Sequence, residues 1–335
     1  MKRKDIIKLN KAPRLISSYT VVGKKEHEGP LGRLFDEHSL DTRFGKKTWE
    51  LAESEMQKRA LIGAITRSGI SASKLGWIFA GDLQNQCAAS SYGLMDFNLP
   101  YVGLYGACST LGEALISASI AIESSAIDSA AVVTSSHFCT AERQFRFPLP
   151  YGNQRQPIAQ RTVTGAGAYI LSSEGVGPRI AEVLVGRIVD KGISDANNMG
   201  AAMAPAAADT LRRYFSESGK SPSDFDVIVT GDLACEGEWL LRELLLREGI
   251  SLRDNYTDCG LMIYNIKEQD VHAGASGCGC SSTVFSGFFM KKLLSGEIKN
   301  MLLVTTGALM SAGSLNQGGT IPGIAHLVHI EGEKR

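Results

Sequence analysis

Ile70-Ser-Ala-Ser-Lys-Leu-Gly-Trp-Ile-Phe-Ala-Gly-Asp-Leu83 has a close counterpart later in the chain, Lys220-Ser-Pro-Ser-Asp-Phe-Asp-Val-Ile-Val-Thr-Gly-Asp-Leu233. Each stretch leaves a helix, turns, and enters an apolar run that ends in Gly-Asp-Leu, which is typical of a buried strand. A segment with apolar residues at helical spacing precedes each one, over residues 48–67 and 201–218. This self-similarity predicts an internal duplication.

A second unit also occurs twice, in the order small-residue turn, helix, turn and apolar strand. In the first half the helical run covers residues 106–124 and the strand covers 130–136. In the second half the helix covers residues 277–294 and the strand covers 301–307. Each half then closes on a glycine-bearing segment leading to a strand, over 165–171 and 318–330.

The two equivalent helices are poor in charge. Between residues 111 and 127 the only charges before the turn are Glu113 and Glu123, and residues 283–289 carry none. A surface helix would show a charged face, and strands alternating with crossover helices favour largely parallel, doubly covered sheets. We therefore expect an α/β fold with five duplicated layers, α/β/α/β/α, made of an N-terminal half (residues 1–175) and a C-terminal half (residues 176–335).

Residues 138–161 form an insertion that we expect to be absent from the second half. The segment carries three prolines, at positions 148, 150 and 157, and has too little periodicity for a helix. Loops of this length in compact domains are usually lids or subunit contacts. We expect this one to cover a pocket.

Composition narrows the functional classes. Lys plus Arg equals Asp plus Glu at 35 each, so charge gives no indication of a nucleic-acid partner. The basic start lacks the apolar core of a signal peptide, and no run approaches the 18 apolar residues of a spanning helix, so any membrane association should be peripheral. The seven cysteines are expected to be free thiols, and Cys278-Gly-Cys280 lacks zinc-site spacing, so we expect no metal and no cofactor.

Cys108 follows a sharp turn of small residues at the start of a predicted helix. A helix N-terminus offers free backbone donors and a favourable dipole, which stabilise a thiolate or a bound anion. A buried cysteine packed beside glycine is an equally weighted structural interpretation of the turn.

Several motifs together resemble the thiolase and 3-oxoacyl synthase superfamily over nearly the whole chain: Gly106-Ala-Cys-Ser-Thr110, Gly165-Ala-Gly-Ala168 and His272-Ala-Gly-Ala-Ser-Gly277. Within it, residues 106–115 and Phe147-Pro-Leu-Pro-Tyr-Gly-Asn-Gln154 resemble the stage V sporulation protein AD family of spore-forming bacteria. The resemblance implies a protein that binds dipicolinic acid, or its calcium chelate, during loading of the developing spore. It also implies contact with membrane subunits of the stage V sporulation A complex, peripheral association with the inner spore membrane of the forespore, and pairing into a homodimer.

The resemblance assigns Cys108 the place of the nucleophile, and the amides of Cys108 and Gly307 the oxyanion hole. The acid/base positions fit poorly, because Gly231 stands where synthases have histidine and Thr305-Thr-Gly307 stands where thiolases have a second cysteine. His272 resembles the remaining catalytic histidine with a spacing one residue shorter, and a structural role for it has equal weight. Each lost acid/base partner removes about 10² to 10⁴ in rate, so we predict that the protein is not an enzyme.

Dipicolinate is flat and carries two carboxylates, so its pocket should offer donors or cations at two ends and an apolar slot between them. Asp82 and Asp232, each just past the end of a strand, could approach a bound calcium ion, although capping the following helix is the favoured role for both. Either candidate cation, Arg146 or Arg155, is more simply read as a solvated loop charge. The candidate ligand-binding residues are Cys108, His272, Gly307, Asp82, Asp232, Gly231, Gly274 and Arg146, with Arg155 as the second arginine.

Two other functions remain open. The chain could be an enzyme that condenses acyl-coenzyme A or acyl-carrier-protein thioesters with Cys108 as nucleophile. It could also be an assembly scaffold whose pocket is vestigial.

Overall fold

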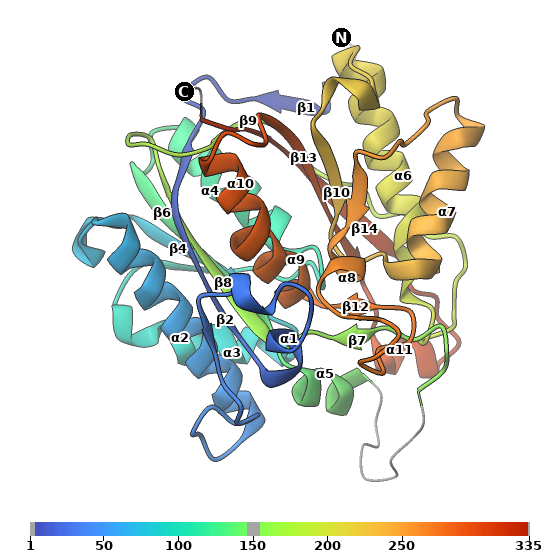
Figure 1. Cartoon of the computed structure of the whole chain (residues 1–335), viewed down its shortest axis with the longest axis horizontal. Coiled ribbons are helices and arrows are strands. Elements are labelled where there is room, and N and C mark those ends of the chain that lie inside the picture. The colour runs from blue at the N-terminus through green and yellow to red at the C-terminus, as the bar shows by residue number, and fades with distance from the viewer. Residues whose placement is uncertain (1–3, 146–154, 334–335) are drawn as a thin grey trace.

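The computed structural model describes residues 4–145 and 155–333 (Figure 1). Its first half alternates strands and helices in the predicted order. The main elements are β2 (Arg14–Val22), α2 (Trp49–Ser68), β4 (Trp77–Gly81), α3 (Ala88–Leu94), β5 (Tyr101–Gly103), α4 (Thr110–Glu123), β6 (Ser129–Ser136) and β8 (Gly165–Ser172).

The second half repeats this order element by element, which confirms the duplicated fold. Its central helix is interrupted by a π-helical turn over Phe285–Phe289. The main elements are β9 (Arg179–Leu184), α6 (Met199–Ser218), β10 (Val227–Thr230), α7 (Ala234–Arg247), β11 (Tyr256–Asp258), α9 (Cys278–Val284), α10 (Met290–Leu294), β13 (Asn300–Ala308) and β14 (Gly323–Glu331).

Strand pairing follows the same plan in both halves. The order is β5-β4-β6-β8-β2 in the first half and β11-β10-β13-β14-β9 in the second. In each, the inner crossover pair is parallel and the closing strand is antiparallel: β4 with β6 and then β8, β10 with β13 and then β14. The two sheets meet where β2 and β9 begin, at the pair Arg14 and Arg179.

The equivalent helices α2 and α6 begin and end with the same kinds of capping residue. Thr48 accepts a hydrogen bond from the Leu51 amide at the start of α2, and Asn198 accepts one from the Ala201 amide at the start of α6. Each helix ends at a left-handed glycine, Gly69 at φ 70° or Gly219 at φ 69°. Side-chain caps at the first turn and glycine at the exit are the usual boundaries of a helix, so these boundaries are encoded locally.

The layers are set by which faces are apolar. Helices α2 and α3 cover the outer face of the first sheet, and α6 and α7 cover the outer face of the second (Figure 1). Helix α4 and the α9–α10 helix lie between the sheets, where Leu115 and Phe285 share one core with Val132 of β6 and Leu303 of β13. Each such fully buried side chain contributes about 1.5–3 kcal/mol, which is why charge-poor helices occupy this layer.

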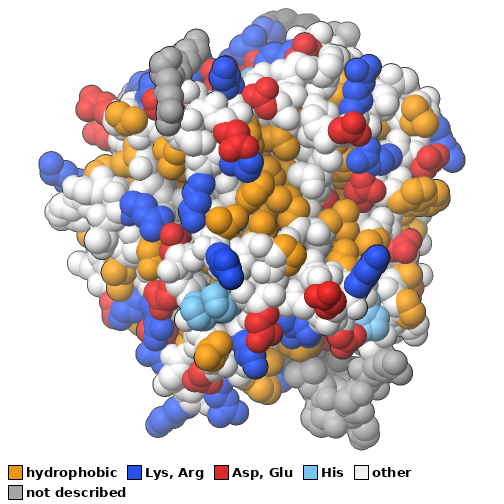
Figure 2. Space-filling model, viewed as in Figure 1, with side chains coloured by type: hydrophobic (Ala, Val, Ile, Leu, Met, Phe, Trp, Pro, Cys, Tyr) orange, Lys and Arg blue, Asp and Glu red, His pale blue; other side chains and the backbone are white. Residues whose placement is uncertain are grey.

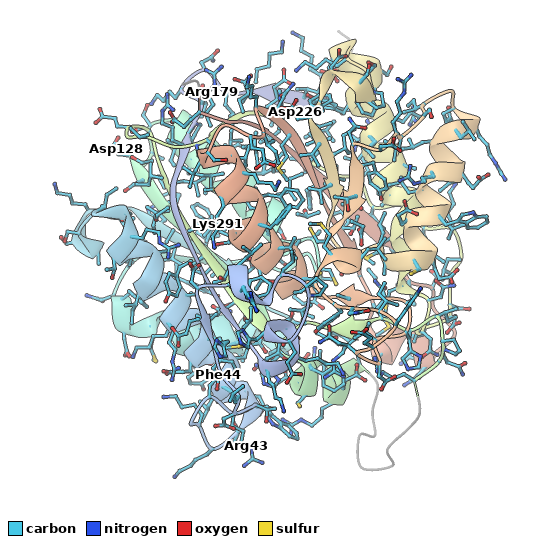
Figure 3. The ribbon with its side chains drawn as sticks, viewed as in Figure 1. Arg43, Phe44, Asp128, Arg179, Asp226 and Lys291 are labelled. Atoms are coloured by element: carbon cyan, nitrogen blue, oxygen red, sulfur yellow. The ribbon has the colours of Figure 1, made fainter. Side chains whose placement is uncertain are left out.

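The direction of the strands places the site at one end of the molecule, where the parallel strands have their carboxyl ends. Asp128, Arg179 and Asp226 stand at or just before the starts of β6, β9 and β10, and all three lie toward the same end in Figure 3. Parallel strands of an α/β sheet bind ligands at their carboxyl ends, and these lie toward the opposite end, where Arg43 and Phe44 are labelled.

The segment after β6 departs from the prediction. Its first part, Phe138–Phe145, is helix α5, and the second half has a short counterpart in α11 (Ala312–Asn316). The insertion is therefore neither wholly irregular nor without an equivalent. An eight-residue helix gives only about two turns of apolar periodicity, and the prolines later in the segment indicated a loop instead.

The remaining elements are short. They are the strands β1 (Ile6–Lys8), β3 (Glu37–His38), β7 (Arg161–Thr162) and β12 (Ala275–Ser276), the helices α1 (Lys24–His27) and α8 (Cys259–Met262), and 3₁₀ turns at Gly32–Leu34, Ala72–Lys74, Asn85–Cys87, Met95–Phe97 and Pro222–Asp224. Within residues 4–145 and 155–333, no helix combines the length and the apolar character needed to cross a bilayer.

Candidate functional site

The Cys108 turn is a tight strand-to-helix reversal. Ala107 has φ 52°, a left-handed conformation, and the Gly106 carbonyl accepts hydrogen bonds from the Ser109 amide (3.0 Å) and hydroxyl (2.7 Å). Gly307 of β13 packs directly on this turn, since a Cβ at position 307 would lie 2.3 Å from the Gly106 carbonyl oxygen. The structure thus places Gly307 against the turn that carries Cys108, the neighbourhood that the superfamily resemblance implied.

A chain of polar contacts connects the Cys108 thiol with the second half of the protein. Its Sγ lies 3.6 Å from the Ser276 hydroxyl, which donates to Asp232 Oδ2 (3.1 Å). The Asp232 carboxylate also accepts from the Gly277 amide (2.9 Å) and the Thr306 hydroxyl (2.8 Å). Strand β12, the end of β10 and strand β13 therefore converge on the thiol.

Burial and the neighbouring carboxylate determine the protonation of this pair. Burial raises the pKa of Asp232 to about 6, against the hydrogen bonds it accepts. Burial also raises the pKa of Cys108 well above its ordinary value of 9.0, and the Asp232 charge raises it further. Even if the pKa of the Cys108 thiol were only 9.0, transferring its proton to the Asp232 carboxylate, whose pKa is about 6, would cost roughly 4 kcal/mol.

Two expectations are corrected here. A thiolate at Cys108 is not favoured, because the loss of water and the Asp232 charge act against it. The expectation that no proton-accepting side chain faces Cys108 is also wrong, because Asp232, one residue beyond Gly231, occupies that place. Gly231 itself donates its amide to the Val304 carbonyl (3.0 Å) within the sheet.

A cavity of about 50 Å³ lies beside the Cys108 thiol. That space holds a few water molecules. Its lining is mostly apolar and includes Leu83, Phe145, Met199, Ala308 and Met310, together with the polar residues Tyr105, Cys108, Glu142, Thr162 and Ser276.

A larger outer cavity of about 480 Å³ shares Tyr105, Phe145 and Met310 with the inner one. Its remaining wall is rich in amide side chains, namely Gln84, Asn85, Gln86 and Gln144. The three shared side chains therefore separate an inner, largely apolar compartment from an outer, polar one.

Asp82 and Asp232 have different roles despite their matching sequence positions. Asp82 accepts from the Gln84 and Ser90 amides (both 2.8 Å), which confirms its predicted capping of α3. Asp232 does not cap α7, because Asp258 accepts from the Leu233 and Ala234 amides instead (both 2.9 Å). The cap reaches α7 from the neighbouring strand β11, and this leaves Asp232 available to the site.

The other predicted ligand residues lie away from the cavity. His272 Nε2 is 3.1 Å from Asp270 Oδ1 on a surface loop, and Gly274, at φ 123°, shapes the turn before β12. Arg155 donates to the Asp270 carbonyl (2.7 Å). Arg146 lies outside the described residues.

A buried carboxylate network supports the cavity wall. Glu53 of α2 accepts from Ser135 (2.9 Å), Gln84 (2.9 Å) and Thr140 (3.0 Å). Burial and then the Asp82 charge raise its pKa to about 7. Glu53 thus ties α5 and the segment after β4 together, next to the lining residues Leu83 and Glu142.

Sequence reasoning missed Ser276, Glu142, Tyr105 and the two methionines of the lining. Ser276 could have been found, because it belongs to the motif His272-Ala-Gly-Ala-Ser-Gly277, in which attention fell on the histidine. Tyr105 lies only three residues before Cys108, so its proximity was available from the sequence. Glu142, Met199 and Met310 carry no local signal, since their proximity to Cys108 depends on how α5, α6 and β13 pack together.

Comparison with known proteins agrees with this arrangement. Residues 3–331 match the family model described as stage V sporulation protein AD. The chain is 39% identical, over 315 residues, to the stage V sporulation protein AD of Bacillus subtilis (strain 168), covering 94% of this chain and 93% of that protein.

Solved structures share the fold at low identity. The 3-oxoacyl-[acyl-carrier-protein] synthase III of Aquifex aeolicus VF5 superposes with a TM-score of 0.59 at 13% identity, covering 95% of this chain and 99% of that chain. A variant of OleA from Xanthomonas campestris gives a TM-score of 0.59 at 15% identity, with coverages of 96% and 98%. These likenesses establish a thiolase-like fold.

Proposed function

The chain belongs to the stage V sporulation protein AD family, and from that premise we propose that it binds dipicolinic acid, or its calcium chelate, at the Cys108 cavity without catalysis. In this proposal it serves uptake of the ligand into the developing spore. The observation that carries the non-catalytic part is the pairing of Cys108, through Ser276, with a carboxylate. A carboxylate opposes thiolate formation, whereas a cationic partner would favour it.

The charge of the cavity favours the calcium chelate over the free dianion. Among the described residues, the lining includes no Lys or Arg, and Asp232 lies directly behind Ser276. A dianion would be repelled by the Asp232 carboxylate, while chelated calcium would neutralise the ligand and attract that carboxylate. A ring with two carboxylates also needs more room than a few waters, so Phe145 and Met310 must move to admit it.

Isothermal titration tests the binding. We expect saturable heat with equimolar calcium and dipicolinate, weaker heat with dipicolinate in a chelator, and little with a monocarboxylate analogue. Cys108→Ala should weaken binding, whereas Cys235→Ala, which alters an exposed thiol, should not. Asp232→Asn should reduce the preference for the chelate because it removes one repelling charge. Absence of saturable heat with both forms of the ligand would refute the proposal.

The alternative function is acyl transfer from coenzyme A or carrier-protein thioesters. The observation in its favour is that Asp232 does offer a proton acceptor near the thiol. Incubation with acyl-coenzyme A followed by intact-protein mass spectrometry decides the matter. An acyl adduct that disappears in Cys108→Ala would overturn the non-catalytic part of the proposal.

We further propose that the protein works peripherally at the inner spore membrane, beside membrane subunits of the stage V sporulation A complex. Figure 2 shows apolar side chains gathered in the middle of one face, and Lys291 of α10 lies on that face in Figure 3. The half-buried residues Leu34 and Phe288 pack against the central core, and the Leu34 carbonyl accepts a hydrogen bond from Lys291 Nζ. Flotation with phosphatidylglycerol vesicles, comparing wild type with Phe288→Ser and Lys291→Glu, tests this surface.

Pairing into a homodimer is also proposed, through the edge strand β5. One side of β5 pairs with β4, and no described strand follows on the other side. Tyr101 (40% exposed) belongs to β5, and the exposed side chains Tyr92 (66%) and Met95 (64%) belong to α3 and the 3₁₀ turn that precede it. Sedimentation equilibrium of wild type and Tyr101→Asp should show a dimer for the first and a monomer for the second.

A further inference from the structure

Three segments of the chain meet at Thr164, beside strand β7. The Thr164 amide donates to Glu26 of α1 (2.9 Å), its carbonyl accepts from the Gly23 amide (2.9 Å), and its hydroxyl accepts from the Phe138 amide at the start of α5 (3.1 Å). Helices α1 and α5 and strands β7 and β12 are drawn together at this place in Figure 1. The hydrogen bonds make the arrangement specific rather than incidental.

Three cationic side chains gather around this junction. The guanidinium groups of Arg161 and Arg155 lie over the same ring, that of Phe138, at 3.6 and 6.0 Å from its centroid. Burial lowers the pKa of Lys25, and the charges of Arg161 and Arg155 lower it further, while the charges of Asp270 and Glu26 oppose them. The three positive charges are therefore close enough to repel one another.

Two carboxylates of the described residues lie close to these cations, those of Asp270 and Glu26. Asp270 approaches Arg155 (3.7 Å) and His272 (3.1 Å), and its side chain is 80% exposed. Glu26 is buried, and its Oε1 accepts from the Thr164 amide and the Tyr264 hydroxyl.

Lys25 and Arg161 have donors to spare. In the described chain, neither side chain makes a hydrogen bond or an ion pair, and the fully buried Nε of Arg161 has no partner. An arginine stacked flat on an aromatic ring keeps its in-plane donors directed sideways, in the fork that suits a carboxylate or a phosphate.

We propose that Lys25, Arg155 and Arg161 form a second binding site, separate from the Cys108 cavity, for a small soluble oxyanion such as a carboxylate or phosphate. These groups suit a small ion better than a membrane surface, because the Arg155 side chain is only 13% exposed and Arg161 Nε is buried. The site stands independently of the ligand proposed for Cys108.

Strand β7 connects this site with the Cys108 cavity. Arg161 pairs with Ala275 and Thr162 pairs with Ser276 in the two-stranded β7–β12 sheet. Alternate residues of a strand face opposite sides, so Thr162 lines the cavity while Arg161 faces away from it. An anion on Arg161 therefore binds one residue away from the wall of the inner cavity.

Titration with inorganic phosphate at constant ionic strength tests the site. We expect saturable binding by the wild-type protein, and about ten-fold weaker binding in Arg161→Gln and in Lys25→Gln, the effect of losing a charge-assisted hydrogen bond. Arg161→Lys, which keeps the charge but not the fork, should fall between. Lys47→Gln, which removes an exposed charge elsewhere, should bind phosphate as the wild type does. Urea unfolding of each variant verifies that it folds.

The outcomes separate this site from its alternatives. Phosphate binding that persists in Cys108→Ala, and that is lost in Arg161→Gln, supports a second site whatever occupies the Cys108 cavity. No saturable binding by wild type, or phosphate affinity in Arg161→Gln and Lys25→Gln equal to that of wild type, overturns it. Binding to phosphatidylglycerol vesicles that depends on Arg161, without binding of free phosphate, also overturns it in favour of a lipid contact.

Discussion

Replacing Asp232 with asparagine should change how the stability of the protein depends on pH. In the folded protein burial raises the pKa of Asp232 from 3.8 to about 6. A carboxyl whose pKa is raised on folding holds its proton more tightly in the native state, so its contribution is favourable below pH 3.8 and is lost as pH rises toward 6. The shift of roughly two units corresponds to about 3 kcal/mol.

The Asp232→Asn variant has no titrating group at this position, so its stability does not fall as pH rises toward 6. It keeps one acceptor oxygen for the three donors from Ser276, Gly277 and Thr306, which should cost about 1–3 kcal/mol at every pH. We therefore expect the variant to be clearly less stable than wild type at pH 4, and nearly as stable or more stable at pH 7.5. The difference in unfolding free energy between variant and wild type should therefore change by about 3 kcal/mol between pH 4 and pH 7.5.

Urea unfolding of both proteins between pH 4 and pH 7.5 measures this difference. Taking the difference between the two proteins cancels other titrating groups, apart from Asp258, whose pKa the Asp232 charge also raises. Thr306→Val is the matched control, because it removes one hydrogen bond to the carboxylate and retains the titration. A stability difference between Asp232→Asn and wild type that stays constant across this range would refute the assigned burial and charge of Asp232.

Three further outcomes follow from the same structure. Alkylation of Cys108 by iodoacetamide, measured by intact-protein mass spectrometry, should be slow at neutral pH. It should be faster in Asp232→Asn, because that variant lacks the charge that opposes the thiolate. Equal alkylation rates in the two proteins would contradict this. Glu53→Gln should abolish a loss of stability that the wild type undergoes as pH rises from 4.5 to about 7, since burial and the Asp82 charge raise the pKa of Glu53 to about 7; unchanged pH profiles in urea would argue against it. Gly307→Ala should destabilise the protein by about 1–3 kcal/mol, because the new Cβ would lie 2.3 Å from the Gly106 carbonyl oxygen; Gly313→Ala, whose Cβ meets nothing closer than 3.9 Å, should show no such loss.

The arrangement at Cys108 combines a buried thiol with a neighbouring carboxylate. The thiol lies at the head of a buried helix, and a cavity lies beside it. Its neighbour is a carboxylate at the end of a hydrogen-bonded serine, which disfavours the thiolate and repels free anions. Such a site suits a neutral or metal-chelated ligand, as the proposed function requires.

The sequence by itself determined the duplicated layers of this protein. Matching Gly-Asp-Leu segments, equivalent helix caps and charge-poor central helices are local signals, and each repeats at the corresponding place in both halves. Hydrophobic periodicity and capping act over a few residues, so they can be recognised without knowing what packs against them. The position of Cys108 at a helix entrance followed from the turn of small residues before it, whereas its closeness to Gly307 was implied by the superfamily resemblance.

Only the tertiary structure decided the chemistry of the site. Asp82 and Asp232 occupy identical motif positions, yet the first caps a helix and the second faces a thiol, because Asp258 from a neighbouring strand supplies the cap of α7. His272, which looked catalytic in sequence, pairs with a surface aspartate, and Ser276, four residues later, reaches Cys108. Hydrogen-bond partners and pKa shifts arise from groups far apart in the chain that burial brings into contact, and no local pattern encodes those distances.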